Sequence, residues 1–195
     1  MFTGIVETMA TLLDKSYQGT NCTFRFESNI THELKIDQSL AHNGVCLTVE
    51  SVSEESYTVT AIDETLKKTN LGDLEPGQHI NLERCLKADG RFDGHIVQGH
   101  VDLTGTLSEV IDQNGSYKLF FRYPPESGHI TVEKGSICIN GISLTVVDSG
   151  PGSFSVAIIP YTWEHTNLKD LNPGDRVNLE FDILGKYMQK ILASG

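Results

Sequence analysis

The stretch Ser39-Leu-Ala-His-Asn-Gly-Val-Cys-Leu-Thr-Val49 decides the fold, because the chain contains it twice. Ser136-Ile-Cys-Ile-Asn-Gly-Ile-Ser-Leu-Thr-Val146 repeats it at an offset of 97 residues, with six of eleven positions identical. Residues 65–83 recur at the same offset as residues 162–180. A constant offset indicates an internal duplication. We therefore predict that the 195 residues form two homologous domains, each long enough to bury a core.

Each repeat has the pattern of β-structure. Residues 56–62 and 153–159 alternate polar and apolar side chains, as half-buried strands do. Asn-Gly at 43–44 and at 140–141 lies between apolar runs and predicts hairpin turns, because both residues tolerate positive φ. Closing such strands into a small barrel removes exposed edges. Residues 65–68 and 162–165 predict one helical turn each, with Thr65 and Thr162 as N-caps.

The end of the chain changes to a helical period. Its apolar residues recur on one face of a helix: Ile183, Leu184, Tyr187, Met188, Ile191 and Leu192. A helix this short has little stability alone, so it needs another surface. That surface is either its own barrel or another subunit.

Composition narrows the partners and the compartment. The chain carries 15 Lys and Arg against 26 Asp and Glu, a formal charge of −11, and so lacks the basic surface that nucleic acids and anionic membranes attract. No apolar run approaches the ~18 residues of a membrane span. The first cation is Lys15, which argues against a secretory signal, and the four cysteines lack a Cys-x-x-Cys spacing. We expect a cytoplasmic protein with reduced thiols, no metal, and neither nucleic acid nor membrane as partner.

The two repeats differ at chemically reactive positions. The pairs that differ are Ile5 and His100, His42 and Ile139, Cys46 and Ser143, Asp63 and Pro160, and Cys85 and Asp182. Two similar pockets with different acids, bases and thiols would suit a reaction in which two related molecules play different parts. Drift between duplicated halves explains the same differences.

Several motifs together resemble the riboflavin synthase family of the α-chain type, which is built from lumazine-binding domains. They are Met1-Phe-Thr-Gly-Ile-Val6, Ala41-His-Asn-Gly-Val-Cys-Leu-Thr-Val49, Gly94-His-Ile-Val-Gln-Gly-His-Val101, Asn140-Gly-Ile-Ser-Leu-Thr-Val146 and Ile159-Pro-Tyr-Thr-Trp-Glu164. The resemblance implies an all-β fold of two tandem six-stranded Greek-key barrels, 1–97 and 98–182. A short C-terminal helix, 183–195, would join a homotrimer in which one subunit's N-terminal site faces a neighbour's C-terminal site.

The resemblance also implies a reaction. Two molecules of 6,7-dimethyl-8-ribityllumazine dismutate: one transfers a four-carbon unit to the other, which gives riboflavin and 5-amino-6-ribitylaminouracil. The family's enzyme is a transferase that needs no cofactor and no metal, because the substrate is both donor and acceptor. In agreement, the sequence shows neither metal-ligand spacing nor a glycine-rich nucleotide loop.

Site residues follow from the resemblance position by position. Around the N-terminal site it places Gly4, Ile5, Val6, Cys46, Leu47, Thr48, Thr60, Ala61, Ile62, Asp63, Glu64 and Thr65, and we add Ser39 as a binding residue. Around the C-terminal site it places Gly99, His100, Val101, Lys134, Ser143, Leu144, Thr145, Ile159, Pro160, Tyr161, Thr162, Trp163 and Glu164. Four residues are expected to be catalytic: Cys46, His100, Ser143 and Asp182.

The catalytic roles rest on ordinary side-chain chemistry. His100 is a candidate base for removing a proton from the 7-methyl group of the substrate, since imidazole titrates near neutrality. Cys46 and Ser143 occupy equivalent positions and can assist proton transfer or add to the acceptor ring. Asp182 can orient a base. Structural alternatives are a buried, hydrophobe-like Cys46 and a solvated Asp63–Glu64 pair. His95 fits the Gly-His pattern but receives only a structural role.

Three rival functions remain. A lumazine protein has the same fold but carries its chromophore without catalysis; an acidic β-barrel could serve as an interaction module; a flavoprotein reductase barrel would need a further nicotinamide-binding domain. Retention of all four catalytic candidates favours the enzyme. Association with lumazine synthase, which some relatives show, stays an open possibility.

Overall fold

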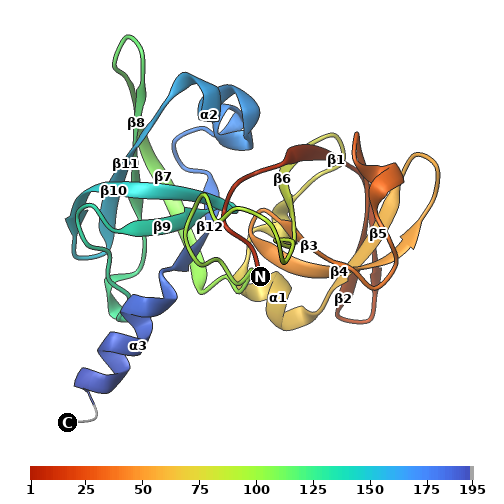
Figure 1. The fold of residues 1–195 in the computed structure, drawn as a ribbon, viewed down its shortest axis with the longest axis horizontal. Coiled ribbons are helices and arrows are strands. Elements are labelled where there is room, and N and C mark those ends of the chain that lie inside the picture. The colour runs from red at the N-terminus through yellow and green to blue at the C-terminus, as the bar shows by residue number, and fades with distance from the viewer. Residues whose placement is uncertain (194–195) are drawn as a thin grey trace.

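The computed structural model describes residues 1–193 as two closed antiparallel β-barrels side by side, with a helix projecting from the second (Figure 1). The N-terminal barrel has the strand order β1-β2-β5-β4-β3-β6, a Greek-key arrangement. Its strands are β1 (Thr8–Gln18), β2 (Asn21–Ser28), β3 (Ser39–His42), β4 (Val45–Val52), β5 (Tyr57–Ala61) and β6 (His79–Arg84). Between β5 and β6 lie helix α1 (Asp63–Lys68) and the 3-10 turn η2 (Leu71–Asp73); η1 (Thr31–Glu33) precedes β3.

The C-terminal barrel repeats this order strand for strand. Its strands are β7 (Leu103–Asp112), β8 (Tyr117–Arg122), β9 (Ser136–Ile139), β10 (Ile142–Gly150), β11 (Ser153–Ile158) and β12 (Arg176–Phe181). Helix α2 (Pro160–His165), η3 (Pro125–Ser127) and η4 (Asn167–Asp170) match α1, η1 and η2. Each barrel encloses its own buried core. The predicted fold of two six-stranded Greek-key barrels followed by a short helix is confirmed.

The two Asn-Gly hairpins meet back to back between the barrels. Asn43 and Gly44 have φ of 47° and 78°, and Asn140 and Gly141 have φ of 46° and 80°, the mirror-image turn that the sequence predicts. A Cβ on Gly44 would lie 2.8 Å from the backbone nitrogen of Gly141, and the reverse distance is also 2.8 Å. Only glycine allows the two turns to approach this closely. The contact lies on an approximate twofold axis that relates the halves.

Six buried asparagines join the barrels around this axis. The Nδ2 group of Asn81 donates to the carbonyl of Asn140, and that of Asn178 donates to the carbonyl of Asn43, both at 2.9 Å. The backbone N–H groups of Asn167 and Asn70 donate to the Oδ1 atoms of Asn81 and Asn178, at 2.8 and 2.7 Å. Buried amides need such partners. The reciprocal bonds therefore fix the relative orientation of the barrels.

The segments that precede β1 and β7 are exchanged between the barrels. The carbonyl of Gly4 accepts from Ser143 N on β10 at 2.7 Å, and the carbonyl of Gly99 accepts from Cys46 N on β4 at 2.9 Å. Val6 packs against the C-terminal core and Val101 against the N-terminal core. Each barrel thus completes its surface with a segment from the other half of the chain.

The two short helices begin earlier than the sequence predicts. Their N-caps are Ile62 and Ile159, and neither uses a side-chain cap, so the prediction of threonine N-caps is wrong. Pro160 at the first helical position presets its φ for the helix. The negative charge of Asp63, in the first turn of α1, is attracted to the positive end of the helix dipole. These devices replace the cap.

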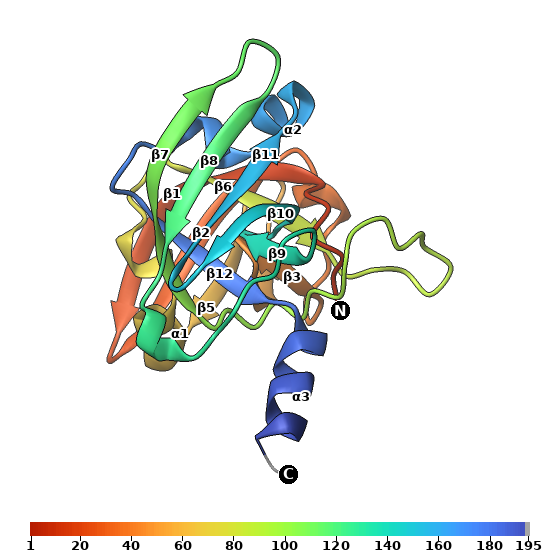
Figure 2. The ribbon, with the colours of Figure 1, turned by 90° about the vertical axis from the view of Figure 1, so that its left-hand side faces the viewer.

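Helix α3 (Ile183–Leu192) projects away from both barrels (Figure 2). Asp182 caps it by accepting from Leu184 N at 3.0 Å, and Lys186 pairs with Asp102 at 2.7 Å. Its apolar residues are between 59% and 79% exposed: Leu184, Tyr187, Met188, Ile191 and Leu192. Of the two surfaces considered from the sequence, its own barrel does not cover this face. Across residues 1–193 no helix is long and apolar enough to span a membrane.

Candidate active site

A cleft of about 510 Å³ opens where the N-terminal segment crosses the C-terminal barrel. Its floor includes Ser143, and its rim carries the exposed side chains of Ile5 and Tyr161. The lining residues are Gly4, Ile5, Val6, Glu7, Thr8, Met9, Asn29, Ile142, Ser143, Tyr161, Thr162, Glu164, His165 and Thr166. Predicted site residues from both ends of the chain therefore come together here.

The exchange of segments corrects the predicted division into two sites. The sequence analysis placed residues 4–6 at the N-terminal barrel and residues 99–101 at the C-terminal barrel. The structure places residues 4–6 beside Ser143 and residues 99–101 beside Cys46. The prediction was wrong because each segment was assigned to the barrel that follows it, whereas each extends onto the neighbouring barrel. His100 consequently belongs with Cys46.

Ser143 has a histidine partner that the sequence analysis left without a chemical role. His95 Nδ1 lies 2.6 Å from Ser143 Oγ, and the His95 backbone N–H donates to the Thr3 carbonyl at 3.0 Å. The ring is buried, and its Nε2 atom has no hydrogen-bond partner. Burial lowers the pKa of His95, while the carboxylate of Asp182 opposes that shift. A neutral imidazole is thus hydrogen-bonded to the hydroxyl, with one ring nitrogen unused.

Gly94 is the sequence feature that could have pointed to the contact between His95 and Ser143. A Cβ at Gly94 would lie 1.9 Å from the Thr3 carbonyl oxygen and 3.1 Å from Ser143 Cβ. No side chain fits there, so glycine allows the chain to bring His95 against the serine. Sequence alone shows the Gly-His pair but not that Ser143 lies beside it.

Cys46 occupies the matching position at the N-terminal barrel with different chemistry. Burial raises the pKa of the Cys46 thiol, and a hydrogen bond with Ser39 opposes the shift. At neutral pH the group is therefore a thiol that can donate a proton, and it is not a thiolate nucleophile. The side chain of the adjacent His100 is exposed, while its backbone N–H donates to Glu180 at 2.9 Å.

The helices beside the two sites present different side chains. On α1, Asp63 pairs with Lys67 at 2.5 Å and Glu64 with Lys68 at 2.9 Å, so both acids lie in exposed ion pairs. On α2, the ring of Tyr161 stacks on His165 with centroids 4.0 Å apart. Trp163 stacks on Tyr117 of β8 at 4.2 Å and packs against the barrel core.

The remaining predicted binding residues are spread between core and surface. Leu47 and Ala61 are buried in the N-terminal core, and Leu144 packs against the C-terminal core. Thr60 bonds Thr23 and Glu50, both at 2.8 Å. The exposed residues are Thr48, Ile62, Thr145, Ile159 and Pro160; Lys134 is also exposed and holds a tight turn at φ 64°. Thr65 lies half-buried on α1.

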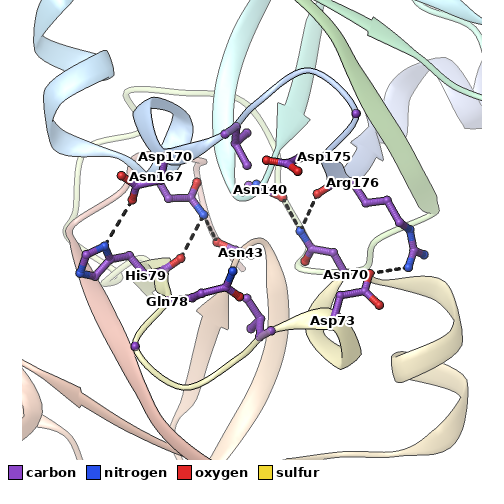
Figure 3. A pocket seen from close by; sticks show the side chains of 14 residues that line it. Asn43, Asn70, Asp73, Gln78, His79, Asn140, Asn167, Asp170, Asp175 and Arg176 are labelled. Atoms are coloured by element: carbon purple, nitrogen blue, oxygen red, sulfur yellow. Dashed lines mark hydrogen bonds and ion pairs between the residues drawn. The ribbon is translucent and has the colours of Figure 1, made fainter.

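A second cleft, of about 520 Å³, lies on the approximate twofold axis (Figure 3). Asn70 and Asn167 point into it from opposite halves, and ion pairs flank it between His79 and Asp170 at 3.3 Å and between Arg176 and Asp73 at 2.5 Å. Most of its polar groups bind each other across the barrel interface. None of the predicted site residues lines it. We therefore take the cleft beside Ser143 as the chemical site and assign the axial cleft a structural role.

Comparison with known proteins places the chain in a family. The lumazine binding domain family model matches residues 3–85 and 98–182, which defines a tandem lumazine-binding-domain protein. Riboflavin synthase of Actinobacillus pleuropneumoniae is 42% identical over 98% of this chain and 90% of its own length. Those of Mycobacterium tuberculosis and Bacillus subtilis are 40% and 35% identical, over 100% and 98% of this chain and 99% and 90% of theirs. The chain belongs to the riboflavin synthase family.

Solved structures share the fold at lower identity. LumP complexed with 6,7-dimethyl-8-(1'-D-ribityl) lumazine superposes with a TM-score of 0.84 at 21% identity, covering 93% of this chain and 99% of that one. LumP complexed with riboflavin gives a TM-score of 0.85 at 22% identity, over 92% and 98%. These matches concern the arrangement of the two barrels.

Proposed function

We propose that this protein catalyses the riboflavin synthase reaction. Two molecules of 6,7-dimethyl-8-ribityllumazine dismutate by transfer of a four-carbon unit, which yields riboflavin and 5-amino-6-ribitylaminouracil. The proposal rests on family membership together with one structural observation: at equivalent positions of the two barrels, Ser143 is hydrogen-bonded to His95, and Cys46 lies beside the segment that carries His100. Paired but chemically unlike sites suit one substrate that serves as both donor and acceptor. The substrate supplies all the carbon that moves, so the proposed transferase needs no cofactor or metal.

At the C-terminal site, Ser143 and His95 serve as a proton relay. The Ser143 hydroxyl takes a proton from the 7-methyl group while passing its own proton to His95 Nδ1, which leaves a substrate carbanion and an imidazolium. The heterocycle delocalises the negative charge, and the carboxylate of Asp182 stabilises the imidazolium. The relay uses Nδ1 alone, because Nε2 of His95 is buried. Ile5 and Tyr161 supply apolar surface for the ring.

At the N-terminal site, Cys46 and His100 act on the second lumazine. The Cys46 thiol, protonated because burial raises its pKa, donates to the ring as charge develops there. The exposed imidazole of His100 serves as the base that accepts and returns protons. Asp63 and Glu64 on α1 exchange their lysine partners for the ribityl hydroxyls. Lys134, Thr48, Thr145 and the other predicted contacts complete the binding of the two substrates. Holding two rings in register contributes ~7–11 kcal/mol to such reactions.

We also propose that the two sites that meet belong to different subunits. The exposed apolar face of α3 supports a homotrimer, in which the N-terminal site of one subunit meets the C-terminal site of the next. The proposed units are 1–97, 98–182 and 183–195, and the proposed compartment is the cytoplasm. Association with lumazine synthase remains an additional proposal that the exposed surfaces allow.

Turnover tests the proposed function directly. The purified chain, given only 6,7-dimethyl-8-ribityllumazine, is expected to form riboflavin, with one equivalent of 5-amino-6-ribitylaminouracil for every two lumazines consumed. Absorbance and fluorescence follow both compounds. Binding without riboflavin formation would instead identify a carrier of the lumazine-protein kind, and absence of both would reject the family's activity for this chain.

A further inference from the structure

Glu83, on β6 of the N-terminal barrel, is a buried carboxylate that binds backbone rather than a cation. Its Oε1 accepts from Thr3 N at 2.7 Å and from Thr3 Oγ1 at 2.9 Å, and its Oε2 accepts from Gly4 N at 2.9 Å. Glu83 is 7% exposed. Burial raises its pKa, and the N–H donors oppose the shift because they stabilise the carboxylate.

Glu180, on β12 of the C-terminal barrel, repeats this arrangement. Its Oε1 accepts from Gln98 N at 2.6 Å, and its Oε2 accepts from Gly99 N at 3.0 Å and from His100 N at 2.9 Å. It is 3% exposed. Each of the two carboxylates therefore holds a segment that crosses from one half onto the other barrel's site strand.

Each held segment is pressed against the site of the opposite barrel. Gly4 has φ 78°, and a Cβ there would lie 2.6 Å from Ser143 Cβ; Gly99 has φ 79°, and a Cβ there would lie 2.6 Å from Cys46 Cβ. Glycine is required at both positions. Immediately after them come Ile5, which lines the cleft, and His100. The carboxylates thus hold the backbone at Gly4 and Gly99, and the next residues, Ile5 and His100, carry side chains at the two sites.

We propose that Glu83 and Glu180 are positioning residues that act across the barrel boundary: Glu83 sets the geometry of the site at Ser143, and Glu180 sets that of the site at Cys46. The inference rests on the proposed function only for the identity of the substrate. That each glutamate acts on the site of the opposite barrel does not depend on that function. If each carboxylate served only its own barrel, its removal would affect the site of that barrel.

Amide hydrogen exchange tests the crossing without any ligand. Glu83→Gln keeps the size of the side chain but replaces one acceptor oxygen with a group that cannot accept. It is expected to speed exchange of the Ser143 amide, which bonds the Gly4 carbonyl, by about tenfold and to leave the Cys46 amide within about twofold. Glu180→Gln is expected to do the reverse. The core amides of Val59 and Val156 report global opening, and rates are compared relative to them.

Riboflavin titration extends the test to binding. Chemical shifts of the Ser143 and Cys46 amides give a separate Kd for each site. Glu83→Gln is expected to raise the Kd at Ser143 about tenfold, with the Kd at Cys46 nearly unchanged, and Glu180→Gln is expected to do the converse. Each variant is also expected to have a lower kcat, by a larger factor than the decrease in its folded fraction, because both sites serve one reaction.

The two variants are controls for each other. Effects on each glutamate's own barrel, or equal effects on both sites, would overturn the proposal. If Glu83→Gln does not fold, Thr3→Val removes only the hydroxyl bond to Glu83 and is expected to loosen Ser143 in the same direction by a smaller factor. If the unaltered protein binds no riboflavin, the proposed function fails, while the exchange pattern still decides the crossing.

Discussion

At the scale of single residues, the proposed chemistry centres on the contact between Ser143 and His95. The contact of 2.6 Å joins a strand to a linker 48 residues earlier. Burial keeps the imidazole neutral, and its second ring nitrogen is buried without a hydrogen-bond partner. A buried nitrogen without a partner carries a free-energy cost. The pair is thus poised for proton transfer.

His95→Gln is expected to lower kcat by about a hundredfold, because an amide can hold the serine but cannot accept its proton. The neutral imidazole is the active form, so activity of the unaltered enzyme should fall on the acid side as pH drops through the lowered pKa of His95. The pH profile of kcat measures this, and the variant should lack the acid limb. An unchanged acid limb in the variant would assign the limb to another group.

The role of His95 could not be predicted from the sequence. Ser143 and Cys46 were recognised because they differ at equivalent positions of a repeat. His95 has no counterpart at the start of the chain, so comparison of the repeats could not draw attention to it. Its role depends on a contact that exists only after the linker crosses the barrel surface.

At the scale of elements, hairpins and alternating strands were predictable, and the exchange of segments was not. Turn chemistry at 43–44 and 140–141 is local, and the structure contains those turns. The choice between two homologous barrels for residues 4–6 is not local, because either barrel offers an equivalent edge. In the structure, the bond from Ser143 N to the Gly4 carbonyl and the packing of Val6 on the C-terminal core place this segment, and Glu83 holds it. The starts of α1 and α2 were misplaced because Thr65 and Thr162 are the third residues of their helices and lie inside the first turn.

A buried histidine is expected to make the stability of the N-terminal barrel depend on pH in the acid range. His42 on β3 bonds Tyr57 at 3.1 Å and the Leu40 carbonyl at 3.0 Å, and burial lowers its pKa from 6.5 to about 3. The unfolded chain therefore binds the proton more tightly. The contribution of His42 to the free energy of unfolding is complete above pH 6.5. It decreases as the pH falls toward 3, by up to about 1.4 kcal/mol per pH unit.

The C-terminal barrel supplies the matched replacement, since Ile139 and Phe154 occupy the equivalent positions. His42→Ile combined with Tyr57→Phe is expected to flatten the pH dependence of N-terminal unfolding between pH 6.5 and 4. Urea unfolding followed by circular dichroism measures this. The single tryptophan, Trp163, reports the C-terminal barrel separately and should show no change. An equally steep dependence in the double variant would assign the acid sensitivity elsewhere.

At the scale of the whole molecule, the proposed homotrimer depends on the exposed apolar face of α3. Leu184→Glu with Ile191→Glu places charge on the apolar face of α3, where a subunit contact would bury it. The variant is expected to sediment as a 21.5 kDa monomer and to lose turnover while each barrel stays folded. Ile36→Glu, at a residue 59% exposed outside the helix, is the control. A fully active monomer would show that one chain brings two substrates together unaided.

The back-to-back glycines and the asparagines around them have a further consequence for how the chain arose. Nearly every bond across that contact has a counterpart in which the two halves trade places, which makes the interface close to isologous. The exception is the bond from Asn81 Nδ2 to Asn167 Oδ1, because Asn70 Oδ1 has no partner among the described residues. Such an interface is the kind that two identical copies form with each other, so the chain has the architecture of a fused symmetric dimer. Fusion freed the reactive positions to diverge, one copy keeping a thiol and the other a hydroxyl. The residues on the axis had no such freedom, because a change in either half removes a bond from both.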